Sequence, residues 1–356
     1  MKKIRAGIIG LAHLHPLTYV PLFEKSDEIQ LTAISEPDPT ILQSSLSKLK
    51  LSVPLQSFAD YRQLIDEAGV EMVAIFSPHH QCPEVVEYAA SRGKHLLIEK
   101  PMAASVEAGE RILKAVEKAG IIASTPYLWR YHQASIEIKR FIKAGYLGQL
   151  FALEGRCIAG RIERYIDGHS AWILKKQQGG GGAMWNLGVH WIDLFNWFLD
   201  GLKPNRAYCE MSSFTPGCEV EDNAHGIVHY GNDVTAIYNI GYSSPPSYPY
   251  GRDLHINIRG SSGSITWNPA FEGQEDEIFL CSDHPDLSDA PNRRIRLTQK
   301  VVPGYCGIMG LHYINDFATS ILKGQPPSIT VADGVEALKV ADLLYRAAEA
   351  RQVISM

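Results

Sequence analysis

The chain has 356 residues, a net charge of −5 at pH 7, and ordinary proportions of apolar (45%) and charged (21%) residues. This length predicts two domains, and the slightly acidic balance offers no basic surface for nucleic acid. No apolar run approaches the roughly 20 residues that cross a bilayer, so we expect no membrane segment.

The cysteines predict a reducing compartment. All six are scattered along the chain and form no CxxC pair: Cys82, Cys157, Cys209, Cys218, Cys281 and Cys306. Such thiols are typical of reduced cytosolic proteins, so we expect a cytoplasmic protein. Residues 1–5 carry the charges of a signal peptide, but the apolar piece at 6–12 is short and broken by glycine. We therefore expect mature protein from residue 1.

Strands and helices alternate over the first 125 residues. Predicted strands lie at 5–10, 31–34, 72–76, 95–98 and 121–123, and predicted helices at 16–24, 39–49, 83–92 and 106–119. Alternation with short turns is typical of a doubly wound parallel sheet. We therefore predict an α/β fold in which residues 1–125 form a doubly wound parallel sheet.

Residues 126–356 have a different pattern. After a predicted helix at 134–144 and a long strand at 149–161, residues 162–178 look irregular. The chain is then rich in strands from 204 to 296. One predicted strand pair lies at 220–228 and 235–240, and a second lies at 253–259 and 264–267. Exposed loops are expected at 251, 274–277 and 283–292, and two helices at 311–322 and 331–350 end the chain. This pattern predicts an α+β domain with a mostly antiparallel sheet and helices on one face.

The first strand-to-helix turn departs from the dinucleotide fingerprint. That fingerprint is G-x-G-x-x-G. Here the six positions are Gly10, Leu11, Ala12, His13, Leu14 and His15, so the first glycine alone is present. We nevertheless expect four residues of this turn to contact the cofactor: Gly10, Ala12, His13 and Leu14.

Two acidic residues follow the second predicted strand. Glu36 and Asp38 fall where an acid binds the hydroxyl groups of the adenosine ribose. Carboxylates there would repel a 2′-phosphate, so NAD is favoured over NADP. The alternative is a solvated turn that caps the next helix, and the sequence leaves both interpretations open.

The apolar strand at 95–98 runs directly into Glu99, Lys100 and Pro101. Ligands of open α/β sheets bind outside the carboxyl ends of such strands. Pro101 keeps Lys100 out of the α region, and partial burial or a positive nicotinamide ring would lower the pKa of Lys100 towards the working range. Lys100 is thus a candidate for exchanging a proton with a reacting oxygen; the alternative is a solvated lysine beside its glutamate.

Four glycines at 179–182 precede a very apolar predicted helix. Asn186, His190, Asp193 and Trp197 follow at steps of four, three and four, so their side chains are expected along one face. This polar face is either a hydrogen-bonded part of the core or the wall of a site. In the second case His190 is a fair proton carrier.

Metal binding is not expected. His225 and His229 point the same way in a predicted strand, but nothing supplies a matching third ligand.

Several of these segments together carry a family resemblance: Gly7 to Gly10, Ser77 to His80, Gly93 to Ala103, Gly145 to Gln149, and the glycine run that ends in Asn186, His190 and Asp193. With them the chain resembles the glucose–fructose oxidoreductase / inositol dehydrogenase / MocA (Gfo/Idh/MocA) family over nearly its whole length. The resemblance implies that residues 1–125 form a Rossmann domain that binds NAD(P). It also implies that residues 126–356 form a substrate-binding α/β domain with a large open sheet, which builds homodimers or homotetramers.

The resemblance also implies NAD(P)-dependent oxidation of a sugar, a cyclitol or a related polyol, or the reverse reduction. Lys100 and His190 would flank the reacting carbon. His190 would exchange the hydroxyl proton, and Lys100 would hold the same oxygen. Further cofactor contacts are expected from Ser77, Pro78, His80, Glu99 and Lys100, and substrate contacts from Arg130, His169, Trp172, Asn186 and His190.

Four substitutions, at three sites, depart from the family pattern. Ala12 and His15 replace glycines of the phosphate turn, and Cys82 stands where the family usually has a second histidine. Asn186 stands where many members have an aspartate, so it cannot raise the basicity of His190 as a carboxylate does. These departures motivate one alternative, a dinucleotide-binding sensor or scaffold without turnover. A second alternative is an NAD-assisted hydrolase or lyase, a chemistry that some relatives show.

Overall fold

The structure, a computed structural model, describes residues 3–49, 54–216, 218–270 and 274–356. The chain forms two compact units. The first comprises Met1–Leu128, Glu163–Gly181 and Val302–Glu336, and the second comprises Trp129–Ile162, Gly182–Val301 and Ala337–Met356. The expected domain boundary between residues 125 and 126 stays a prediction.

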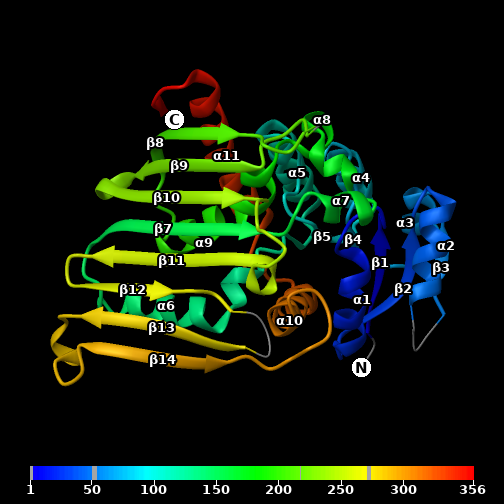
Figure 1. Cartoon of the computed structure of the whole chain (residues 1–356). Helices are drawn as coiled ribbons and strands as arrows, with labels where there is room; N and C mark the ends of the chain where they lie inside the picture. The colour runs from blue at the N-terminus through cyan, green and yellow to red at the C-terminus, as the bar shows by residue number, and fades with distance from the viewer. Residues whose placement is uncertain (1–2, 50–53, 217, 271–273) are drawn as a thin grey trace. The chain divides into compact units, whose positions relative to one another are not determined.

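The first unit contains the predicted doubly wound sheet. All its strands are parallel, and their order is β3-β2-β1-β4-β5-β6 (Figure 1). The strands are β1 (Ile4–Ile9), β2 (Ile29–Ser35), β3 (Gln56–Phe58), β4 (Met72–Ile75), β5 (His95–Ile98) and β6 (Ala123–Ser124). The order reverses between β1 and β4, and ligands of such sheets bind at this switch point. The Rossmann prediction is therefore confirmed.

Local signals explain where the helices of this unit begin and end. Pro16 and Pro39 stand in the first turns of their helices, where a missing N–H costs nothing. The Asp38 carboxylate accepts the amides of Thr40 (2.8 Å) and Ile41 (3.2 Å), which confirms the capping interpretation for Asp38. The helices are α1 (Pro16–Lys25), α2 (Pro39–Lys48), α3 (Tyr61–Glu67), α4 (Cys82–Ser91), α5 (Val106–Ala119) and α10 (Gly307–Lys323).

The second unit is built on a nine-stranded sheet of order β14-β13-β12-β11-β7-β10-β9-β8-β15. Neighbouring strands are antiparallel except for β7 and β10, which confirms the mostly antiparallel prediction (Figure 1). The strands are β7 (Leu150–Ala159), β8 (Pro204–Ser212), β9 (Asn223–Tyr230), β10 (Val234–Gly241), β11 (Arg252–Gly260), β12 (Gly263–Trp267), β13 (Glu275–Ser282), β14 (Asn292–Thr298) and β15 (Ile354–Ser355).

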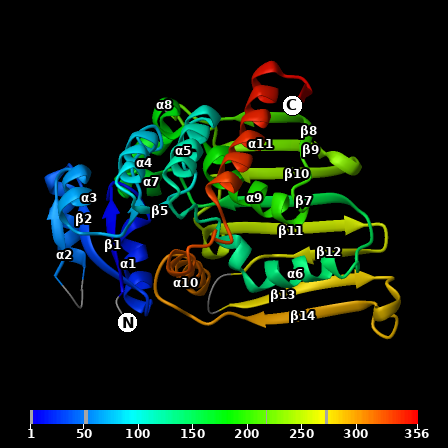
Figure 2. The same cartoon turned by 180° about the vertical axis from the view of Figure 1, so that it is seen from behind.

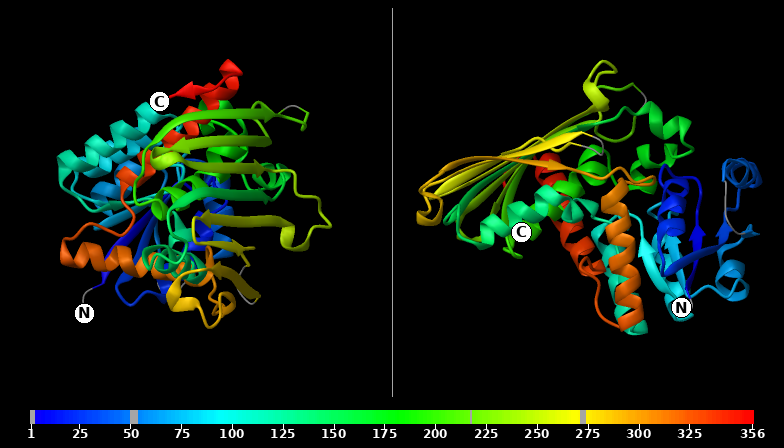
Figure 3. Two further views of the ribbon diagram at one scale, coloured as in Figure 1. Left: turned by 90° about the vertical axis from the view of Figure 1, so that its left-hand side faces the viewer. Right: turned by 90° about the horizontal axis from the view of Figure 1, so that it is seen from below.

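Helices cover one face of this sheet. Figures 2 and 3 show α6 (Gln133–Lys143), α9 (Val189–Phe198) and the part of α11 (Val331–Ala350) after residue 336 on the same side. In β9 the residues facing these helices are buried, whereas the alternate side chains His225 and Ile227 are exposed. Within this unit, the described residues place no helix over the opposite face. The expected open sheet is thus observed.

Two sequence predictions were wrong here. Residues 274–277 are not a loop, because β13 begins at Glu275 and Asp276 faces inward, 1% exposed. The acids that suggested a loop pair with arginines of β14, as Glu277 does with Arg294. Residues 162–178 are not irregular, because they contain α7 (Glu163–Asp167), the 3-10 turn η2 (Ala171–Leu174) and the start of α8 (Lys176–Gly179).

No helix in the described part of the chain combines the length and the apolarity that crossing a bilayer requires.

Candidate functional site

A pocket of about 390 Å³ lies at the carboxyl ends of β1, β2 and β4, the switch point of the first unit. Its wall includes three predicted cofactor residues of these strand ends, Gly10, Glu36 and Ser77, together with Ala12 and Pro78. Gly10 has φ +85°, and a Cβ there would lie 3.0 Å from the backbone of Phe76 and Ser77. The close approach of these two strand ends therefore requires the glycine.

Glu36 holds the first turn in shape. Its side chain is buried, and one carboxylate oxygen accepts the amides of Leu11 (2.7 Å) and Ala12 (3.2 Å). The other oxygen accepts the amide of Asp38 at 3.1 Å. The carboxylate thus binds the turn after β1 to the end of β2 and puts a negative charge into the pocket wall.

Two neutral histidines lie at this turn. Burial holds the pKa of His13 well below its usual range, and burial lowers the pKa of His79 to about 3. His79 Nδ1 donates to the carbonyl of Gly179 at 2.7 Å, so its proton is on that nitrogen. The ring of Trp172 contacts both imidazoles, and its indole N–H donates to the carbonyl of Ala12 at 2.7 Å. Trp172 thereby covers the turn.

Lys100 lies at the end of β5 and is 2% exposed. This burial excludes the solvated lysine that the sequence left open. Glu99 is 3% exposed, and its Oε1 lies 3.2 Å from Nδ1 of His15. Burial raises the pKa of Glu99, and electrostatic interactions with His13 and Lys100 oppose that shift. The buried carboxylate and the buried ammonium therefore act on each other.

The second unit holds the glycine run against Glu221. The buried carboxylate of Glu221 accepts the amides of Gly182 and Met184 at 2.9 Å and the hydroxyl of Tyr345 at 2.6 Å. A Cβ on Gly182 would lie 1.9 Å from the carbonyl oxygen of Glu221. The absence of a side chain at Gly182 is what permits this contact.

The polar residues predicted to share one face of the helix after the glycine run lie partly in a π-helical turn and partly in α9. The chain makes a π-helical turn over Met184–Gly188 before α9 begins at Val189. Such turns widen the helix and occur frequently at functional sites. Asn186 lies within it and donates to the hydroxyl of Tyr242 at 2.9 Å, and Tyr242 donates to the carbonyl of Gly182 at 3.2 Å. Asn186 and His190 are both buried.

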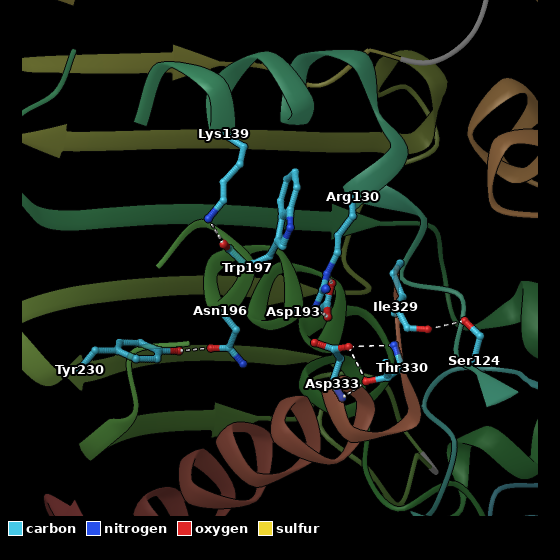
Figure 4. Close-up of polar contacts among 10 residues, drawn as sticks. All are labelled: Ser124, Arg130, Lys139, Asp193, Asn196, Trp197, Tyr230, Ile329, Thr330 and Asp333. Atoms are coloured by element: carbon cyan, nitrogen blue, oxygen red, sulfur yellow. Dashed lines mark hydrogen bonds and ion pairs between the residues drawn. The ribbon is translucent and has the colours of Figure 1, made fainter. Parts of the chain in front are cut away.

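Asp193 binds a predicted substrate residue. Its carboxylate accepts two hydrogen bonds, of 2.6 and 2.9 Å, from the guanidinium of Arg130, and Figure 4 shows the two groups facing each other. Both side chains are buried, at 1% and 9% exposure. This bidentate pair fixes α9 to the turn before α6. Nearby, the ammonium of Lys139 caps the end of α9 at the carbonyl of Trp197.

The remaining predicted site residues are less enclosed. His169 is exposed and has φ +56°, and His80 is exposed with its amide on the carbonyl of Gln178. Roles for Arg130, His169 and Trp172 in substrate binding stay predictions, as do the cofactor contacts of Leu14 and His80.

Sequence reasoning missed four residues of these arrangements: His15 as the partner of Glu99, His79, Glu221 and Tyr242. His79 lies in the segment Ser77 to His80, which belongs to the family resemblance. Only its burial distinguishes it from the exposed His80. His225 and His229 lie in β9, and the described residues contain no group of three or more His, Cys, Asp or Glu side chains that could hold a metal ion.

Comparison with known proteins decides the family. Residues 4–127 match the oxidoreductase family with an NAD-binding Rossmann fold, and residues 136–266 match the Gfo/Idh/MocA C-terminal domain. The chain belongs to the Gfo/Idh/MocA oxidoreductase family. It is therefore an NAD(P)-dependent oxidoreductase, as the sequence predicted.

The relatives are distant but align over nearly their full length. Levoglucosan dehydrogenase of Pseudarthrobacter phenanthrenivorans is 22% identical, over 98% of this chain and 97% of the relative. The scyllo-inositol 2-dehydrogenase (NADP(+)) of Bacillus subtilis is 23% identical, over 99% and 96%. A solved levoglucosan dehydrogenase in complex with NADH and levoglucosan shares the fold, with a TM-score of 0.82 at 19% identity over 99% of each chain.

Proposed function

We propose that this oxidoreductase transfers a hydride between NAD and a sugar, a cyclitol or a related polyol, with Lys100 and His190 as its catalytic residues. The relatives named above act on substrates of this class. The observation that carries the assignment of Lys100 is its burial at the carboxyl end of β5, the edge of the sheet where ligands bind. Burying an ammonium group lowers the stability of the folded state, so a buried lysine is expected to have a function that offsets this loss.

The first unit has features that fit a dinucleotide. The turn after β1 approaches the end of β4 through a glycine, and the pocket beside it is lined by backbone and by a carboxylate. Bound NAD supplies the acceptor or donor of the hydride. The neutral imidazoles of His13 and His79 and the ring of Trp172 form an apolar cover over this turn, which would limit access of water.

Side chains of the protein would carry out the proton transfer. Lys100 would hold the reacting oxygen as a hydrogen-bond donor, and His190 would take up or return the hydroxyl proton. Asn186 would orient a substrate hydroxyl, because its own amide is fixed by Tyr242 and carries no charge. Geometry, rather than a carboxylate partner, would then set the reactivity of His190.

Glu36 favours NAD over NADP. Its carboxylate lies in the pocket wall, where a 2′-phosphate would meet a like charge. Arg62 lines the same pocket, but its guanidinium is already bonded to Glu84. NADP is a cofactor of some relatives, so the preference itself needs measurement.

The open face of the large sheet is the surface we assign to homodimer or homotetramer formation. Ile227 and Ile237 lie directly opposite each other on β9 and β10, and both are more than a third exposed. Exposed apolar pairs on a flat sheet are suited to a partner sheet. The six free thiols further favour a cytoplasmic location.

A panel of sugars and cyclitols with NAD and, separately, NADP tests this proposal. NADH absorbance should rise with at least one polyol, more with NAD than with NADP, and Lys100→Met should abolish the rise. Binding of NAD with no turnover on any polyol would support a sensor instead. NAD retained through purification, with product formed but no net NADH, would support hydrolase or lyase chemistry.

A further inference from the structure

Glu99 is a buried carboxylate that the reaction as proposed above does not use. It ends β5 immediately before Lys100, and its side chain is 3% exposed. Taking a carboxylate out of water favours its neutral form unless hydrogen bonds and positive charges compensate. The state of Glu99 therefore depends on what the surrounding elements direct at it.

His15 supplies the nearest such group. Its Nδ1 lies 3.2 Å from Oε1 of Glu99, and the two residues are 84 positions apart in the chain. An ionised carboxylate only accepts hydrogen bonds, so with Glu99 ionised the Nδ1 of His15 carries the proton and donates it. The imidazole ring is held in place by Tyr305, whose ring centroid is 4.1 Å away, and by the edge of His13 at 4.7 Å.

The other titratable groups around Glu99 are its chain neighbour Lys100, His13 of the first turn, and three weakly acidic groups. Electrostatic interactions with His13 and Lys100 oppose the rise that burial causes in the pKa of Glu99, and the charge of Glu99 in turn raises the pKa of the three weakly acidic groups. These groups are Tyr19 of α1, Cys82 of α4 and Tyr313 of α10, each fully buried. With their raised pKa values these three groups stay neutral at ordinary pH, so His15 and Lys100 are the neighbours that can stabilise a negative charge on Glu99 against its burial.

We propose that His15 is a positioning residue for Lys100: its Nδ1–H keeps the Glu99 carboxylate ionised, and that carboxylate keeps the Lys100 ammonium protonated. The proposal rests on the catalytic role assigned to Lys100 above. His15 also occupies the third glycine position of the dinucleotide fingerprint. The substitution that weakens the fingerprint thus provides a hydrogen-bond donor to Glu99, which the glycine it replaces could not.

The expected consequence is a change in the acid limit of turnover. If His15 cannot donate, the Glu99 carboxylate takes up a proton at higher pH, and Lys100 then loses the negative charge that favours its ammonium. Activity that needs the ionised Glu99 beside the Lys100 ammonium therefore falls off at higher pH on the acid side. An opposite charge at short range shifts a titration by about 1 to 3 units, so for a hydrogen-bond donor a shift of about one unit is expected.

Two substitutions of His15 separate hydrogen bonding from packing. His15→Leu removes the donor, whereas His15→Asn places an amide N–H near the position of Nδ1 and cannot take a second proton. The acid limb of kcat/KM should move up by about one pH unit in His15→Leu and return in His15→Asn. Glu99→Gln, which cannot ionise, should lower kcat/KM across the whole pH range. His312→Leu, at an exposed position of α10, is the control that should leave the limb in place.

A second readout needs no substrate. In protein labelled with 15N-histidine, the His15 Nδ1 signal should be that of a protonated ring nitrogen, and Glu99→Gln should change it. An unprotonated Nδ1 in the wild-type protein would overturn the proposal, as would an unmoved acid limb in His15→Leu. If Lys100→Met kept full activity, the proposed function itself would fail, and this outcome is independent of the His15 signal.

Discussion

The end of β5 and the start of α9 each contain a buried glutamate, but the two glutamates have different kinds of partner. At the end of β5 the buried Glu99 meets an imidazole and an ammonium, both of which can gain or lose a proton. At the start of α9 the buried Glu221 meets two backbone amides and a tyrosine hydroxyl, which cannot titrate near neutral pH. The first arrangement can respond to charge, and the second can only hold a shape.

This difference between titratable and non-titratable partners suggests that the two regions have different roles in catalysis. The strand end supplies groups whose protonation matters, whereas the glycine run and the π-helical turn fix the position of Asn186 and His190. Substitutions in the first region should therefore change the pH dependence of activity. Substitutions of the residues that hold Asn186 and His190 in place should change stability or the positions of groups.

Lys100→Met should have the largest effect. General acid–base and electrostatic roles are worth about 10² to 10⁴ in rate, and we expect a loss of about 10³ in kcat/KM. Binding of NAD, followed by quenching of tryptophan fluorescence, should stay within a few fold of wild type. Lys114→Met, on the exposed side of α5, is the matched control. Comparable activity in both variants would remove Lys100 from the mechanism.

His190→Asn should come next, with a loss of about 10² in kcat/KM, because a proton carrier is removed and a polar side chain of similar shape stays. The KM for substrate should change less than kcat. His225→Asn, at an exposed position of β9, is the control and should retain activity. A loss confined to KM would assign His190 to substrate binding alone.

Gly182→Ala tests the shape-holding role of the second region. The added Cβ would meet the carbonyl of Glu221 at 1.9 Å, so the glycine run must move. Overpacking of this kind costs about 1 to 3 kcal/mol, and we expect about 2 kcal/mol from denaturant unfolding. Gly231→Ala is the matched control, since its nearest neighbour atom would be 3.9 Å away. Equal stability of the two variants would contradict the tight contact.

Asp276→Asn should give the smallest effect, and one that depends on pH. Burial raises the pKa of Asp276 to about 6, so the folded state binds a proton more tightly than the unfolded state. Its stabilising contribution is therefore present at low pH and is lost as pH rises through about 4 to 6. The amide removes the buried charge and retains an oxygen for the indole N–H of Trp267, which donates to Asp276 at 2.7 Å.

We therefore expect Asp276→Asn to raise the free energy of unfolding by about 1 kcal/mol near pH 8 and to leave it unchanged near pH 4, the lower end of that range. Thermal unfolding at the two pH values measures this difference. Asp286→Asn, at an exposed position, should show neither effect. A variant less stable than wild type near pH 8 would mean that the charge of Asp276 is compensated, for example by His132, whose Nε2 lies 3.2 Å from its Oδ2.

Local signals in the sequence determined much of the first unit. Apolar runs, proline at helix starts and Gly120 at a helix end each act within a few residues, so β1, β5, α2 and α5 could be predicted closely. Signals that act within a few residues also allowed Lys100 to be placed at a strand end, where ligands bind. The predictions failed where a charge pattern depended on a neighbouring strand: Glu275 and Glu277 were assigned to a loop, but they lie in β13 and pair with arginines of β14.

Only the tertiary structure decided how the polar groups are paired. His15 meets Glu99 across 84 residues, Glu221 meets Tyr345 across 124, and Trp172 meets Ala12 across 160. The π-helical turn at Asn186 likewise follows from its fixation by Tyr242 and Glu221, and not from local preference. Residue order sets which side chains are available and where strands and helices form. Which of those side chains share one buried volume, and therefore which protonation states are stable, follows from packing between segments far apart in the chain.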